Sequence, residues 1–66
     1  MSNYAVQTVS GTILVRDARD LTDLAAELVE QGYVMTEEPL TSGFRAVVIF
    51  EANVIAISAE VADGSA

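Results

Sequence analysis

One stretch of the chain has the periodicity of an amphipathic helix, while the segments on both sides of it have the patterns of strands. Between residues 20 and 31, apolar side chains recur at the offsets i, i+3, i+4 and i+7, and they are Leu21, Leu24, Ala25 and Leu28. Asp20 is a candidate N-cap, with Asp17 as a competitor one turn earlier, and Gly32 suits the left-handed position that ends a helix. The sequence therefore predicts a single helix whose apolar side faces a sheet.

Several segments alternate or run apolar in the manner of β-strands. They are residues 4–9, 12–16, 33–36, 44–50 and 54–61. Ser10 and Gly11 between the first two segments indicate a tight hairpin, although one long strand with a bulge at Gly11 is an alternative. The stretch EEPLTSG, residues 37–43, is rich in turn residues and is expected to form a loop. Residues 62–66 are expected to fray.

The segment 44–50 is the most apolar of the expected strands. One of its faces carries Phe44, Ala46, Val48 and Phe50, and the other carries Val47 and Ile49. Such a strand is expected inside the sheet or under a partner, with segment 54–61 antiparallel to it. We predict a single domain over residues 1–66, with an α+β fold in which one helix packs on a mostly antiparallel sheet of four or five strands. One helix covers one face, so the second face, with Val47 and Ile49, must be polar elsewhere, curl on itself or meet another subunit.

The charge of the chain limits the classes of partner. Ten acidic residues against three arginines give a formal charge of −7, and lysine is absent. Direct binding to nucleic acid or to anionic lipid needs the opposite sign. No basic leader precedes Tyr4, and the longest apolar run, 46–50, is too short to cross a bilayer. These features predict a cytoplasmic binding protein that touches neither nucleic acid nor membrane directly.

The residues that most enzymes use are missing from the sequence. Without histidine, cysteine or lysine, the chain has no Ser–His or Cys–His pair, no Schiff-base lysine and none of the usual zinc ligands. The glycines are isolated, so no phosphate-binding loop is present. Glu37 and Glu38 could form an acid pair or a magnesium site, but their place beside an expected loop favours solvated side chains. We expect no catalysis, no cofactor and no metal.

One edge of the expected helix is acidic and carries Asp20, Asp23, Glu27 and Glu30. These residues fall within about 80° on a helical wheel and span ~15 Å along the axis. One strand of B-DNA carries a phosphate every ~3.4 Å, which is a comparable charge spacing. This edge, extended by Asp17 or by Glu37 and Glu38, could therefore fill a groove lined with Lys and Arg as a DNA mimic. The alternative is an ordinary solvated helix face, on which Arg19 neutralises part of the charge through its i, i+4 neighbour Asp23.

In its small size, its acidity and its lack of catalytic residues, the chain resembles phage-encoded anti-CRISPR proteins, above all the small acidic inhibitors of type I surveillance complexes. The resemblance covers the whole chain and rests on this character, without a diagnostic motif. It implies a non-enzymatic inhibitor that acts in a bacterial cytoplasm and blocks a DNA-binding Cas subunit. The partner-binding residues of this hypothesis are Asp20, Asp23, Glu27, Glu30, Glu37 and Glu38.

Two alternatives involve other surfaces. Residues 12–35, TILVRDARDLTDLAAELVEQGYVM, look like the strand, acidic turn, helix and glycine-ended return of ACT-type regulatory domains, which implies binding of a small effector. The glycine usual in that turn is replaced by Arg19 or Asp20, and the second helix of the ACT pattern has no counterpart. An antitoxin or phage accessory protein would instead bind through its apolar sheet, with Phe44, Val48 and Phe50 as contacts. Such a protein could also form a homodimer.

Overall fold

The computed structural model describes residues 2–59, which form five strands, one α-helix and one 3₁₀ turn. The strands are β1 (Ser2–Thr8), β2 (Gly11–Asp17), β3 (Tyr33–Leu40), β4 (Gly43–Phe50) and β5 (Val54–Ala59). The helix α1 spans Leu21–Gln31, and the 3₁₀ turn η1 spans Glu51–Asn53. Within residues 2–59, no helix is both long enough and apolar enough to cross a lipid bilayer. The expected end of the last strand, 60–61, and the expected frayed tail, 62–66, lie outside the described residues.

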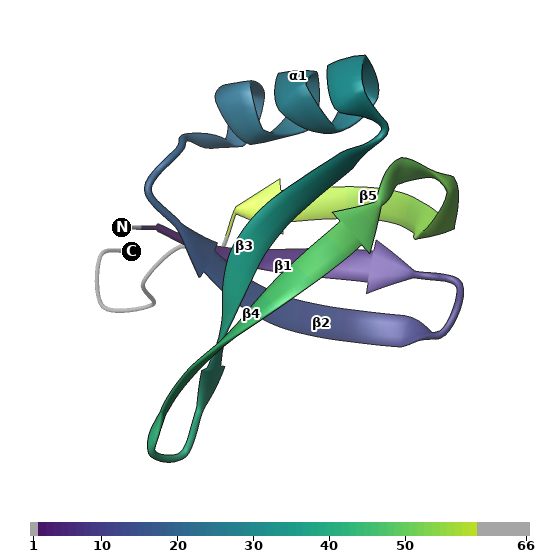
Figure 1. The fold of residues 1–66 in the computed structure, drawn as a ribbon. Helices are drawn as coiled ribbons and strands as arrows, with labels where there is room; N and C mark the ends of the chain where they lie inside the picture. Colours follow the sequence, from purple (N-terminus) through teal and green to yellow (C-terminus); the bar gives the residue numbers. More distant parts are fainter. Residues whose placement is uncertain (1, 60–66) are drawn as a thin grey trace, which may run out of the picture.

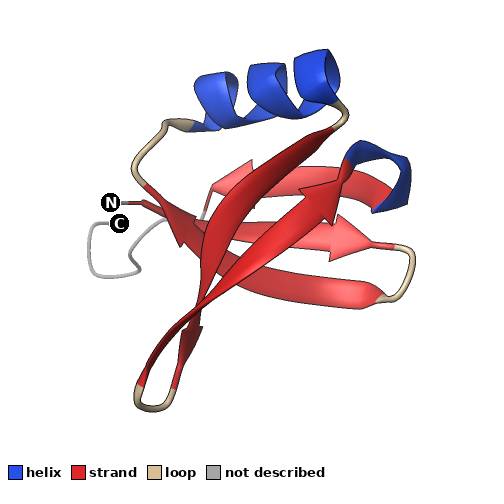
Figure 2. Ribbon diagram, in the orientation of Figure 1, coloured by secondary structure: helices blue, strands red, loops and turns tan. Residues whose placement is uncertain are grey.

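The strands form one antiparallel sheet in the order β4-β3-β2-β1-β5, and α1 lies on one side of it (Figures 1 and 2). This arrangement confirms the predicted α+β fold with one helix on an antiparallel sheet. β1 and β2 form the tight hairpin and not one long bent strand. Thr8 pairs with Gly11, so the turn residues are Val9 and Ser10, one position earlier than predicted.

The predicted ends of the helix are confirmed. Asp20, and not Asp17, is the N-cap, and its Oδ1 accepts a hydrogen bond from the backbone N–H of Asp23 at 2.8 Å. Gly32 ends the helix with φ of 82°, and its N–H donates to the carbonyl of Leu28 at 2.8 Å. Glycine adopts this left-handed conformation without the steric cost that other residues meet. The two caps therefore fix where the chain leaves β2 and where it enters β3.

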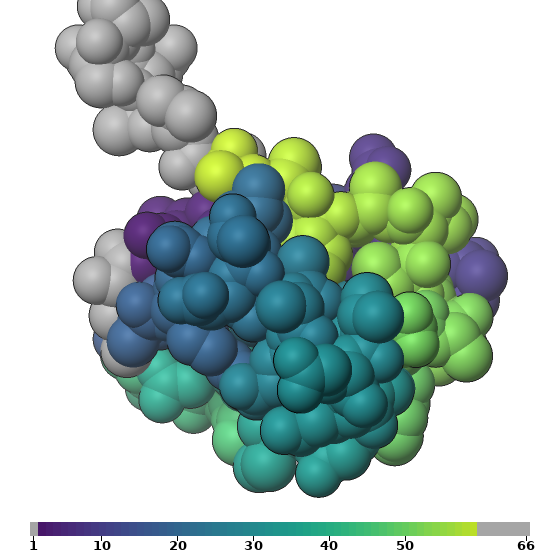
Figure 3. Space-filling model, turned by 90° about the horizontal axis from the view of Figure 1, so that it is seen from above, coloured from purple at the N-terminus to yellow at the C-terminus, as the bar shows by residue number. Residues whose placement is uncertain are grey.

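A single hydrophobic core lies between α1 and the sheet. Its fully buried members come from α1 and from β1 to β4, and they are Tyr4, Val6, Val15, Leu24, Leu28, Val34 and Ile49. Val54 and Ile57 of β5 pack against this core, as does Leu21 at the start of the helix. Seen from the helix side, α1 (blue to teal) lies across the molecule with β5 (yellow) beside it (Figure 3). The predicted apolar face of the helix is therefore the buried one.

The segment predicted as a loop is largely strand. β3 continues to Leu40, and residues 41–42 alone form the turn. The cross-strand register runs through this segment without interruption, with Glu38 opposite Arg45. The prediction is wrong here because a proline disfavours a strand only where its N–H is needed for the ladder.

The hairpin geometry explains how Pro39 fits into β3. In a two-residue hairpin the closing pair, here Leu40 and Gly43, exchanges backbone hydrogen bonds, and the next pair, here Pro39 and Phe44, does not. The nitrogen of Pro39 therefore points away from β4 and toward the β2 side. The pairing of β2 with β3 includes Glu37 but does not extend to Pro39, so the missing N–H of Pro39 costs no hydrogen bond.

β4 lies at an edge of the sheet, so the expected interior place is wrong, while the alternative expectation, cover by a partner, stays a prediction. β5 pairs antiparallel with β1 and not with β4. The connection is the 3₁₀ turn η1, which, unlike a two-residue turn, does not fold the chain back onto the strand before it. The sequence predicts Val47 and Ile49 on the face of β4 that the helix does not cover. In the structure Ile49 is buried in the core, and the uncovered face carries Phe44, Val48 and Phe50, which are exposed.

Candidate binding surfaces

The face of the β3–β4 hairpin that points away from α1 is apolar along most of its length. We call it the apolar stripe, and its residues are Tyr33, Met35, Phe44, Ala46, Val48 and Phe50. Successive side chains of a strand point to opposite faces, so Val34 and Ile49 fill the core while their neighbours point outward. The large members of the stripe are 41% to 59% exposed. Within residues 2–59, no helix or strand lies over this face (Figure 2).

Aromatic rings lie at both ends of the apolar stripe. The rings of Tyr33 and Phe50 are cross-strand neighbours, with centroids 6.5 Å apart and an angle of 52° between their planes. At the other end, the guanidinium carbon of Arg16 lies 3.6 Å from the centroid of the Phe44 ring, in a cation–π contact. Each of these rings is therefore held by a neighbouring side chain.

Only part of this surface can be identified from the sequence. Phe44, Val48 and Phe50 are the expected contacts of an interaction module, and Tyr33 and Met35 are not among them. Tyr33 and Met35 alternate with smaller residues along the third strand, but this pattern shows that they share a face with Val48 and Phe50 only when the partner strand is known. The register with β4 supplies that information.

The acids predicted to contact a partner lie in two separate places. Four of them follow one side of α1, which we call the acidic edge, and they are Asp20, Asp23, Glu27 and Glu30. Three members of the acidic edge border one shallow depression together with Arg19, whereas Asp20 is engaged as the helix cap. Glu37 and Glu38 lie on β3 and, as consecutive strand residues, point to opposite faces of the sheet. The structure thus brings Asp23, Glu27 and Glu30 together and separates the two strand acids.

Arginines pair with half of these six acids. The pairs are Arg19 with Glu27, Arg16 with Glu37 and Arg45 with Glu38. Ion pairs of this partly exposed kind stabilise a fold little, but each one cancels a charge at close range. Within residues 2–59, Asp23 and Glu30 form no ion pair. These two carboxylates are therefore the members of the acidic edge whose charge is most available to a partner.

Arg19 joins the loop after β2 to both α1 and β3. Its guanidinium forms a two-pronged pair with Asp17, with Nε at 2.7 Å from Oδ1 and Nη2 at 2.8 Å from Oδ2. Nη1 donates to Glu27, and Nη2 donates to the carbonyl of Met35 at 2.7 Å. The expected pairing of Arg19 with Asp23 is not formed, because Arg19 precedes the N-cap and does not lie on the helix.

The ion pair makes stability depend on pH. Hydrogen bonds from the Arg19 side chain hold the pKa of Asp17 at about 2, below the ordinary 3.8, and outweigh the opposing effect of burial. A carboxyl whose pKa is lowered by folding stabilises the fold above its unfolded pKa, and this stabilisation disappears as the pH falls through the folded pKa. We therefore expect the free energy of unfolding to fall by about 2 kcal/mol between ~pH 5 and ~pH 2 on account of Asp17. Urea titrations followed by circular dichroism measure it, and an identical pH profile in Asp17→Asn would contradict it.

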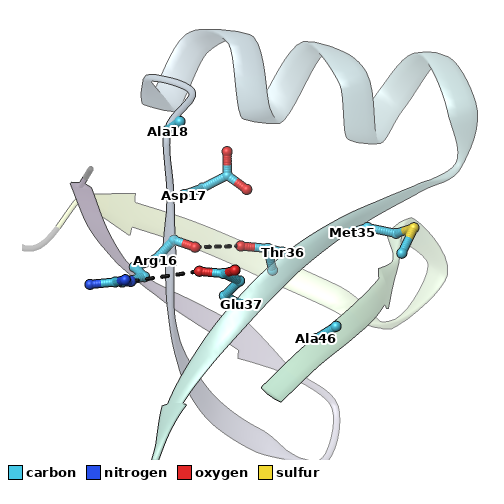
Figure 4. Close-up of a pocket in the computed structure, with 7 residues that line it drawn as sticks. All are labelled: Arg16, Asp17, Ala18, Met35, Thr36, Glu37 and Ala46. Atoms are coloured by element: carbon cyan, nitrogen blue, oxygen red, sulfur yellow. Dashed lines mark hydrogen bonds and ion pairs between the residues drawn. The ribbon is translucent and has the colours of Figure 1, made fainter. Parts of the chain in front are cut away.

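A shallow depression lies where β2 ends beside β3 and β4 (Figure 4). It adjoins the turn from β2 into α1, within the residues 12–35 for which a small effector is the alternative expectation. Asp17 and Glu37 line it, and both carboxylates already bind arginines, Arg19 and Arg16. The hydroxyl of Thr36 donates to the carbonyl of Arg16 at 2.8 Å. In the part of the chain from 2 to 59, no group of three or more acidic side chains is arranged to hold a metal ion.

Comparison with known proteins gives no relative from which a function could be transferred. No family model, no curated protein and no solved structure matches the chain. A function must therefore be inferred from the two surfaces, the apolar stripe and the acidic edge.

Proposed function

We propose that the protein is a non-enzymatic interaction module that binds another protein through the apolar stripe. The observation that carries this function is the exposure of five large apolar side chains, each between 41% and 59%, on one face of one hairpin. Single exposed apolar residues are common on soluble proteins, whereas contiguous ones mark interaction sites. The stripe is contiguous because its members are cross-strand neighbours, such as Met35 and Val48.

The charges indicate the chemistry of the partner. The stripe has one acidic neighbour on its own face, Glu37, whose carboxylate lies 3.7 Å from the guanidinium of Arg16. The contact face is therefore close to neutral, while the whole chain carries −7. Apolar contact would supply the affinity, and the negative field would steer the protein toward a basic surface. The partner is thus a protein with an apolar groove and a basic rim, such as the target of an antitoxin or of a phage accessory protein.

A second candidate function is inhibition of a nucleic-acid-binding complex by DNA mimicry, as the likeness to anti-CRISPR proteins implies. It is favoured by Asp23 and Glu30, which form no ion pair within residues 2–59 and border the same depression. Their carboxylates would take phosphate positions in a basic groove, for example of a Cas subunit in a type I surveillance complex. We rank this function second because Arg19 neutralises Glu27 and Asp20 is engaged in capping, which shortens the free array.

Site-specific photo-crosslinking in bacterial cells decides between the two surfaces. A photoreactive phenylalanine analogue replaces Met35 in the apolar stripe or Glu30 in the acidic edge, and both positions are exposed. We expect a discrete covalent adduct with one protein from position 35 and none from position 30, because only the stripe is buried in the complex. Adducts from position 30 alone would contradict the proposal and support mimicry.

Matched charge variants serve as controls for the adduct. Val48→Asp puts a charge in the middle of the stripe, and Glu30→Lys reverses one on the acidic edge, at positions exposed enough for both variants to fold. Val48→Asp should weaken binding by about tenfold or more, because the new carboxylate would be buried against an apolar surface. Glu30→Lys should change mainly the association rate and its salt dependence. The opposite pattern, with binding lost in Glu30→Lys, would favour DNA mimicry.

A further inference from the structure

We propose that the free edge of β4 pairs antiparallel with β4 of a second copy of this chain. β4 is the last strand of the sheet on its side, and within residues 2–59 no strand pairs with its outer edge. Its backbone donors and acceptors on that edge are therefore available to an added strand. Such pairing would enlarge the apolar stripe, and this consequence for partner docking rests on the proposed function.

β4 lacks the features that usually shield an edge strand. Proteins protect such strands with proline, lysine, bulges or short length. β4 has eight residues, contains no proline or lysine, and pairs with β3 in continuous register without a bulge. Its one charged residue, Arg45, is bound to Glu38. The opposite edge differs, since the register of β5 with β1 shifts at Gln7/Thr8, and within residues 2–59 β5 has six residues.

The hairpin fixes which groups of β4 face outward. Because Gly43 belongs to the hydrogen-bonded closing pair with β3, the alternate residues Phe44, Ala46 and Val48 direct their N–H and C=O groups to the free edge. A twofold axis at Ala46 would set Ala46 opposite its own copy and Phe44 opposite Val48 of the partner subunit. An aromatic side chain opposite a β-branched one is a favourable cross-strand pair. The strand is therefore complementary to itself in this register.

The distribution of charge also points to β4 as the self-contact. Two copies that each carry −7 repel one another, so association is favoured where acids are absent. None of the acids lies on β4, the two acids of the neighbouring strand, Glu37 and Glu38, are paired with Arg16 and Arg45, and the acidic edge lies on α1 (Figure 1). In the proposed register Arg45 faces Val47 of the partner subunit, so the two arginines are not directly opposite.

Pairing through β4 would also enlarge the apolar surface that a binding partner can contact. With strands ~4.8 Å apart and ~3.3 Å per residue, the outer face of one hairpin covers ~250 Å². That is small beside the ~800 Å² that each partner buries in a standard interface. Two hairpins joined through β4 would present ~500 Å² of continuous face. A second copy therefore brings the stripe closer to the size that a specific complex needs.

A single cysteine tests the register. The chain has no cysteine, so Ala46→Cys introduces one thiol at the proposed twofold axis. Facing Cα atoms of a hydrogen-bonded antiparallel pair lie ~5.5 Å apart, within reach of a disulfide. We expect mild oxidation to give a disulfide-linked dimer of Ala46→Cys, whereas Ala56→Cys, an exposed position on β5, stays monomeric. No covalent dimer from Ala46→Cys, or equal yields from the two variants, would overturn the proposal.

Sedimentation equilibrium tests the same contact without a thiol. The wild-type chain should approach twice the monomer mass as its concentration rises, and added salt should strengthen the association by screening the repulsion. Ala46→Pro removes one outward N–H and should be monomeric, while Ala46→Thr keeps that N–H and should dimerise. A wild-type monomer at millimolar concentration would refute self-pairing. If crosslinks from position 35 to another protein persist in that case, the proposed function stands and the dimer alone fails.

Discussion

Replacing Arg19 with methionine should lower the free energy of unfolding by about 2 to 3 kcal/mol. The substitution keeps an unbranched stem as far as the position of Nε but removes the donors that hold Asp17, Glu27 and the carbonyl of Met35 together. The Asp17 side chain is only 11% exposed, so its carboxylate would lose its cation in a poorly solvated place. The expected decrease in the free energy of unfolding is smaller than for a fully buried ion pair, because the Arg19 side chain is 26% exposed. Urea unfolding at neutral pH measures it.

Arg45→Met is the matched control for that substitution. Arg45 also binds a carboxylate, that of Glu38, but its side chain is 62% exposed on the hairpin. Its replacement should change the free energy of unfolding by less than about 1 kcal/mol. Arg19→Met should in addition flatten the acid-side fall in stability that Asp17 causes, whereas Arg45→Met should leave it in place. Equal destabilisation by the two variants would mean that Arg19 does not join the elements as described.

The end of the helix could be predicted to the residue, and its start to within one turn, because its determinants are local. The cap at Asp20, the apolar spacing and the left-handed Gly32 all lie within one short stretch of sequence. The same holds for the β1–β2 hairpin, whose turn was misplaced by only one residue. Where neighbouring residues decide a structure, the pattern of the sequence is sufficient to identify it.

The place of β4 could not be predicted in the same way. Its apolar character indicated a strand inside the sheet or under a partner, but position in a sheet depends on which distant strand each edge meets. β5 meets β1, with Ile57 opposite Val6, and so buries Ile57 beside the core instead of extending the sheet past β4. The apolar outer face of β4 is then left without cover, which is the reason that it becomes a candidate binding surface.

The acidic residues show the same division between local and distant determinants. The helix pattern put Asp23, Glu27 and Glu30 along one side of α1, where the structure has them, but it could not show that Glu27 would be neutralised by Arg19 from outside the helix. The pair of Arg45 with Glu38 depends on the β3–β4 register, which passes through a segment expected to be a loop. Charge density along a sequence is thus an upper limit on the charge that a folded surface presents.

Truncating Leu24 to alanine should remove most of the stability of this small domain. Leu24 is 1% exposed and packs from α1 into the single core, so the change deletes buried methyl groups and leaves a cavity. Such substitutions cost about 2 to 5 kcal/mol, against a total of about 5 kcal/mol for a domain of this size.

Val29→Ala provides the comparison for Leu24→Ala on the same helix. Val29 is 66% exposed, so its truncation should change the free energy of unfolding by less than about 0.5 kcal/mol. Thermal unfolding followed by circular dichroism should therefore show a largely unfolded Leu24→Ala variant beside a Val29→Ala variant that melts like the wild type. Because the apolar stripe exists only while β3 and β4 are held against this core, Leu24→Ala should also abolish crosslinking from position 35, although position 24 is not part of the stripe. An intact, cooperatively folded Leu24→Ala variant would show that the sheet does not depend on the helix for its stability.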